Sequence, residues 1–147
     1  MNEWAKVWVN DPYDDYNLTI EIICDNKDVA LIKQSTQGLI LKWHISPIGL
    51  VIPADWFAKL LQEAKRDIRD PVTVEDDVKI GQWTANWEST PDGNTPILKI
   101  FCDSEDIAVI EQSEQELSLK WDADSKKLII PANWLLEQLI AAKEGMG

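Results

Sequence analysis

Apolar and polar residues alternate with a period of two through most of the chain. In Leu117-Ser118-Leu119-Lys120-Trp121 every second residue is apolar and the residues between are polar, which is typical of a strand in an antiparallel sheet with one solvent-exposed face. Similar patterns, bounded by turn residues such as Asp25-Asn26-Lys27-Asp28, predict further strands. In the first part of the chain they cover 4–8, 18–24, 29–34, 39–44 and the short segment 50–52.

The period changes to that of a helix after residue 53. Apolar residues then recur at helical spacing, namely Trp56, Leu60, Leu61, Ala64 and Ile68. Asp55 is a good N-cap residue, and Asn133 is its counterpart later in the chain; alternatively, Pro53 and Pro131 mark the first turn. The pattern therefore predicts four or five antiparallel strands followed by one helix.

This pattern occurs twice. When the sequence is shifted by 78 residues, about 21 of the 44 positions from Ile22 to Lys65 are identical. Upstream of Leu18 the shift is 79, which places Trp4 on Trp83 and Trp8 on Trp87. All eight Trp and both Cys then form matched pairs. We interpret this as a tandem duplication.

The repeat divides the chain into residues 1–70, a connector over 71–80, and residues 81–147. Because a single helix covers only one sheet face, we expect the two copies to associate about a pseudo-two-fold axis, as a homodimer fused into one chain. The expected fold class is α+β, with one compact pseudo-dimeric domain. The formal charges of the three segments are −3, −2 and −7, so the acidity lies mostly in the second copy.

The junction of short strand and helix also suggests a family. Gly49-Leu50-Val51-Ile52-Pro53-Ala54-Asp55-Trp56 resembles the end of the positive-cofactor-four type of transcriptional coactivator, where an aliphatic strand is followed by a Pro or polar cap and a helix that opens with Trp. The resemblance covers about 25 residues of each copy and implies a dimeric fold that binds single-stranded nucleic acid on curved sheets. The strands here lack the interleaved basic and aromatic residues that such binding uses, so the resemblance supports the fold more than the activity.

Composition excludes several classes of protein. The chain has 147 residues, 45% of them hydrophobic, and a net charge of −12. This charge disfavours a general nucleic-acid binder and adhesion to an anionic membrane. No apolar run reaches the roughly 20 residues of a membrane span, no secretory signal is visible, and two Cys make no disulfide framework. We expect a cytoplasmic protein.

The residues with possible chemistry have plain structural explanations. Cys24 and Cys102 lie among aliphatic residues and are expected to be small buried side chains. His44 is the single His, so we predict no His-rich metal site, no catalytic constellation, no enzyme activity and no cofactor. The Trp residues of the first strand of each copy share one strand face, which we expect to be buried.

Four residues are candidates for binding. Lys42 and Lys120 occupy the same position on the polar strand face of each copy and can mark a symmetric binding surface. Tyr13 and Tyr16 lie in an acidic loop that can engage a basic partner. The leading prediction is a non-enzymatic binding or regulatory module whose acidic second half meets a basic protein surface. The alternative is single-stranded nucleic-acid binding, implied by the resemblance.

Overall fold

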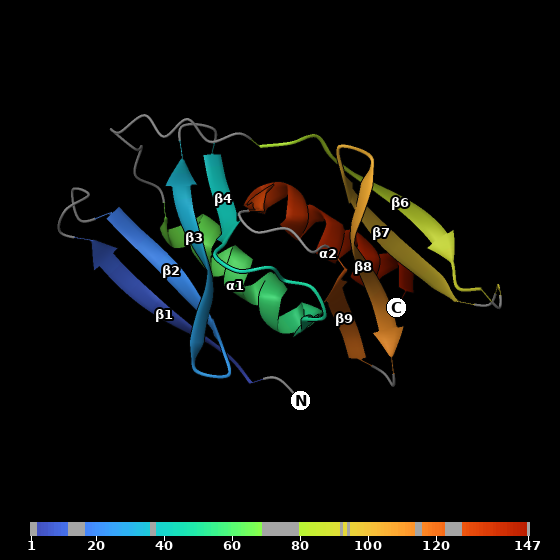
Figure 1. Ribbon diagram of the computed structural model, residues 1–147, viewed down its shortest axis with the longest axis horizontal. Coiled ribbons are helices and arrows are strands. Elements are labelled where there is room, and N and C mark those ends of the chain that lie inside the picture. The colour runs from blue at the N-terminus through green and yellow to red at the C-terminus, as the bar shows by residue number, and fades with distance from the viewer. Residues whose placement is uncertain are drawn as a thin grey trace.

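The computed structural model describes residues 3–11, 17–35, 38–68, 80–91, 93, 95–113, 116–122 and 128–146. In these residues the protein is α+β, with two antiparallel five-stranded sheets and two helices, as the sequence predicts. The helices lie in the middle of the molecule, between the sheet that contains β1–β4 and the sheet that contains β6–β9 (Figure 1). Tyr13, Tyr16 and the predicted connector, except Ile80, fall outside the described residues.

The elements follow each other in the same order in both parts of the chain. The first part has β1 (Trp4–Asp11), β2 (Asn17–Cys24), β3 (Lys27–Ser35), β4 (Gly38–Trp43), β5 (Val51–Pro53) and α1 (Ala54–Asp67). The second has β6 (Trp83–Ser89), β7 (Pro96–Cys102), β8 (Glu105–Ser113), β9 (Glu116–Trp121), β10 (Ile129–Pro131) and α2 (Ala132–Met146).

Each sheet takes its fifth strand from the other part of the chain. The first sheet has the order β1-β2-β3-β4-β10, and the second has the order β5-β9-β8-β7-β6. Thus β5 pairs with β9 through Ile52 and Leu119, while β10 pairs with β4 through Ile130 and Leu41. The sequence pattern had placed each short strand in the unit of its own helix. The structure instead exchanges these strands, so the two parts of the chain interlock.

The registers of the two sheets match position by position. Trp4 is paired with Cys24 in the first sheet, and Trp83 with Cys102 in the second. The β2–β3 ladder shifts register after Ile22, and the β7–β8 ladder shifts after Ile100. The two irregularities therefore lie 78 residues apart, which is the shift that aligns the two copies in the sequence.

Both helices begin directly after a proline. Pro53 is the N-cap of α1, with ψ of 119° and no side-chain cap hydrogen bond, and Asp55 lies inside the first turn. The prediction of Asp55 as N-cap is therefore wrong. An acidic residue in the first turn still interacts favourably with the positive end of the helix dipole. Ile68 ends α1, where its N–H donates to the Ala64 carbonyl.

The core lies between the sheets and the helices and contains Trp43 and Trp121, both fully buried. The Trp residues of the edge strands are less buried than the sequence predicts. Trp4, Trp8 and Trp83 pack partly buried against the core, but the Trp87 side chain is 47% exposed. An edge strand has a neighbour on one side only, so its inner-face residues are less covered.

No helix in the described part of the chain combines the length and the apolar composition needed to cross a membrane.

Candidate functional site

Lys42 and Lys120 lie at matched positions of the two sheets. Because Leu41 and Trp43 belong to the core, alternation places Lys42 on the opposite face of the first sheet, here called the outer face. Its cross-strand partners are Leu31 and Ile129.

Lys120 has the same placement on the outer face of the second sheet, where its partners are Val109 and Val51. The structure therefore puts each lysine between aliphatic residues, one on each sheet. Lys42 is half-buried and Lys120 is exposed.

The outer faces mix aliphatic residues with charges of both signs. On the first sheet, the row through Lys42 continues from Leu31 to Glu21 and Val7. On the second sheet, the corresponding row reaches Lys99, whose Nζ lies 3.5 Å from the Asp106 carboxylate. Neither row is the continuous basic and aromatic strip that single-stranded nucleic acids bind.

The β2–β3 hairpin of the first sheet and the β7–β8 hairpin of the second have turns with the same backbone conformation. Asp25 and Asn26 both have positive φ, as do Asp103 and Ser104, which fits two-residue turns of the kind that suits the twist of a hairpin. Asp25 Oδ1 accepts a hydrogen bond of 2.8 Å from the Glu3 backbone N–H. Asp103 Oδ1 accepts the equivalent bond, of 2.9 Å, from Gln82. Both aspartates thus fix the start of the adjoining edge strand.

Side-chain charge distinguishes these two hairpins. Four exposed carboxylates lie at the second hairpin, here called the acidic hairpin end: Asp103, Glu105 and Asp106 of the hairpin itself, and Asp122, which follows β9. Asp122 joins the group because its backbone N–H donates to the Ile107 carbonyl. The corresponding residues of the first sheet are Asp25, Lys27, Asp28 and His44.

With His44 neutral, the formal charges of these two matched groups are −4 and −1. One carboxylate of each group has a nearby nitrogen: Asp28 lies 3.9 Å from His44 Nε2, and Asp106 lies 3.5 Å from Lys99 Nζ. The sequence contained a signal for this site, because Lys27 and His44 align with Glu105 and Asp122. None of these residues is among the four binding residues predicted from the sequence.

The two cysteines are free, Cys24 buried and Cys102 half-buried. Burial raises the pKa of both thiols, and the neighbouring Asp25 and Asp103 raise it further. A raised pKa keeps a thiol protonated and poorly nucleophilic. Neither cysteine therefore has the environment of an activated nucleophile.

In the described residues, no three side chains of His, Cys, Asp or Glu are placed to hold a metal ion together. The acidic hairpin end is thus a spread of surface charges. Comparisons with known protein families, with curated proteins and with solved structures found no match to this chain.

Proposed function

We propose that the protein is a non-enzymatic binding module whose acidic hairpin end binds a basic surface of a partner protein. The observation that carries this proposal is the difference in formal charge, −4 against −1, between two matched groups, each made of a hairpin turn with the same positive-φ residues and the residue that follows the next strand. Because the fold needs the same turn at both places, the additional carboxylates of Glu105 and Asp122 serve no visible folding purpose. Exposed charge of one sign speeds association with a partner of opposite charge and contributes specificity.

We further propose that the chain arose by tandem duplication and that its two parts are related by a pseudo-two-fold axis. The matched strand registers support this, as do two equivalent hydrogen bonds. Trp4 Nε1 donates to the Val51 carbonyl over 3.0 Å, and Trp83 Nε1 donates to the Ile129 carbonyl over 3.1 Å. On this proposal the two copies diverged in charge at this end of the sheet after duplication, while the fold stayed the same. A cytoplasmic location stays a prediction.

The experiment compares two variants that lose the same amount of charge in different places. The first is Glu105→Gln/Asp106→Asn/Asp122→Asn, which neutralises the acidic hairpin end but keeps Asp103 and its hydrogen bond. The control is Glu116→Gln/Glu137→Gln/Glu144→Gln, which neutralises three exposed carboxylates elsewhere in the second half of the chain.

Each protein is immobilised and exposed to lysate of the source organism, and retained proteins are identified and then titrated individually. We expect a basic protein that wild type and control bind equally, that the hairpin variant binds weakly, and that salt releases. Equal retention by all three proteins, or retention of no basic protein, would contradict the proposal.

The alternative, single-stranded nucleic-acid binding, rests on the matched positions of Lys42 and Lys120 and on the family resemblance. It is tested by titrating labelled single-stranded oligonucleotides at about 50 mM salt, where phosphate contacts are strongest. Binding that is lost in Lys42→Gln/Lys120→Gln would favour this alternative. No binding to wild type would remove it.

A further inference from the structure

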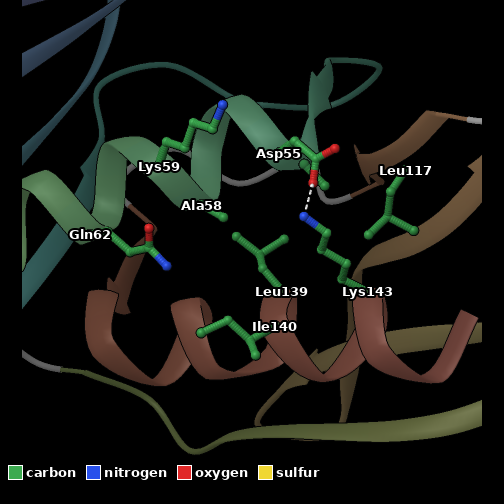
Figure 2. Close-up of a pocket in the computed structure, with 9 residues that line it drawn as sticks. Asp55, Ala58, Lys59, Gln62, Leu117, Leu139, Ile140 and Lys143 are labelled. Carbon is green, nitrogen blue, oxygen red and sulfur yellow. Dashed lines mark ion pairs between the residues drawn. The ribbon is translucent and has the colours of Figure 1, made fainter. Parts of the chain in front are cut away.

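A cavity of about 150 Å³ opens between α1 and α2, beside the first residues of β9 (Figure 2). The helix α1 contributes Asp55, Ala58 and Lys59; Ala58 and Lys59 follow Asp55 by three and four residues, so both lie on the helical face of Asp55. The opposite wall comes from Leu139 and Lys143 of α2, and Leu117 of β9 lies at one end.

The inner part of this cavity is apolar. Leu117 and Leu139 are buried core residues, and the methyl group of Ala58 points toward Leu139 in Figure 2. The lining of the whole cavity is mixed, because Asp55, Lys59, Gln62 and Lys143 accompany the aliphatic side chains, and its volume of about 150 Å³ is large enough for a benzene-sized ring. The space therefore fits one six-membered ring.

Residue 58, which lines the cavity, is small. The alignment of the two parts of the chain places Leu136 at the position of Ala58. Leu136 is 5% exposed and belongs to the core, whereas Ala58 packs partly buried against it. A leucine is thus accepted by this fold at the matched position, and its absence at residue 58 leaves an opening.

The mouth of the cavity carries more positive than negative charge, in a chain whose net charge is −12. Lys143 Nζ lies 3.5 Å from Asp55 Oδ1, across the mouth (Figure 2). The two side chains are 71% and 61% exposed, so this ion pair is weak and Lys143 can turn to another anion at little cost. Lys59 supplies a second exposed ammonium group on the rim.

We propose that this cavity binds a small aromatic monocarboxylate. The ring lies against Leu117 and Leu139, in the space beside Ala58. The carboxylate replaces Asp55 as the ion-pair partner of Lys143 and lies near the ammonium group of Lys59. This site is separate from the acidic hairpin end and is independent of the function proposed above.

The test uses three probes with the same ring and different charges, namely benzoate, benzyl alcohol and benzylamine. Each is titrated into the ¹⁵N-labelled full chain at about 150 mM salt, which screens the overall charge of the protein. We expect saturable shifts of the Ala58 and Leu139 amide signals, with benzoate the tightest of the three probes. In Lys143→Gln, affinity for benzoate should fall about two- to fivefold, while affinity for benzyl alcohol stays unchanged.

The substitution Ala58→Leu fills the cavity and should abolish the saturable shifts. Ala141→Leu is the matched control, because it adds the same side chain at an exposed position of α2 and should leave binding unchanged. Any of three results would overturn the proposal: no saturable shift in wild type, undiminished binding in Ala58→Leu, or benzylamine or benzyl alcohol binding as tightly as benzoate. If Ala58→Leu does not fold, the affinity of Lys143→Gln for benzoate decides instead, and an affinity equal to that of wild type would overturn the proposal.

Discussion

Trp43 and Trp121 meet edge to face in the centre of the core, with ring centroids 5.0 Å apart and planes inclined by 69°. Each is the last residue of a strand, β4 and β9, and each is 0% exposed. The backbone N–H of Trp43 donates to the Leu128 carbonyl, and that of Trp121 donates to the Leu50 carbonyl. The pair therefore joins the two sheets at the point where each receives its exchanged strand.

We predict that these two rings contribute to stability jointly. Trp43→Leu and Trp121→Leu should each lower the free energy of unfolding, because each removes a large buried side chain and leaves a cavity; full truncation of such a side chain costs about 3–5 kcal/mol. In a double-mutant cycle followed by urea denaturation, the coupling should be about 0.5–1.5 kcal/mol, as for aromatic pairs in general. Strictly additive effects would contradict the prediction.

The strand pattern could be predicted from the sequence, but the partners of β5 and β10 could not. The reason lies in β9 and β4, the strands with which β5 and β10 pair. Leu39, Leu41, Lys42 and Trp43 of β4 have identical counterparts in β9, so the side chains offered to an incoming strand are nearly the same in both sheets. Alternation determines which face is buried, and not which of two similar edges is chosen.

The sequence predicts the burial of the tryptophans only in part, because alternation shows which strand face a residue occupies but not how far another element covers that face. A period of two places Trp83 and Trp87 on the same strand face, but it cannot show how far the helix extends over that face. The ring of Trp87 lies against Gly145, near the end of α2, where a Cβ atom would come within 2.6 Å of the ring. The helix α2 covers this strand face only as far as its last residues, and the Trp87 side chain is therefore 47% exposed.

We predict that the exchanged strands make the two parts of the chain unfold together. Ile52 belongs to β5 but is buried in the second sheet, opposite Leu119. Ile52→Ala should cost about 2–5 kcal/mol. Amide hydrogen exchange should then accelerate in both sheets by a similar factor. Acceleration confined to either sheet would show instead that they unfold independently.

The hydrogen bonds from Trp4 and Trp83 to the exchanged strands should each contribute to stability. Replacing either tryptophan with Phe keeps an aromatic ring but removes the N–H, with a cost of about 0.5–1.5 kcal/mol. The effect should be larger for Trp83, whose bond to Ile129 is partly buried, than for Trp4, whose bond is exposed. Trp87→Phe is the control in thermal or urea unfolding. A cost for the control equal to that of Trp83→Phe would contradict this assignment.

The ion pair between Lys6 of β1 and Glu63 of α1 should contribute little. Both side chains are about one-third exposed, at 31% and 34%, and such pairs are typically worth less than about 1 kcal/mol. The second half of the chain has Ala85 and Ala141 at the matched positions, so the fold accepts alanine at both. Lys6→Ala/Glu63→Ala should therefore shift the urea midpoint only slightly, and a loss of several kcal/mol would refute this.

The two thiols should react slowly with alkylating agents, and their rates should respond to the neighbouring aspartates. Because burial and Asp103 raise the pKa of Cys102, Asp103→Asn should lower that pKa, increase the thiolate fraction at pH 8 and speed reaction with iodoacetamide. Asn retains a side-chain oxygen for the Gln82 N–H and tolerates the positive φ of residue 103. Since a thiol with a raised pKa holds its proton longer in the folded state, the wild-type protein should lose stability as pH rises above about 8.5, the ordinary thiol pKa. This loss should be smaller in Asp103→Asn, and an unchanged alkylation rate would show that the Asp103 charge does not act on Cys102.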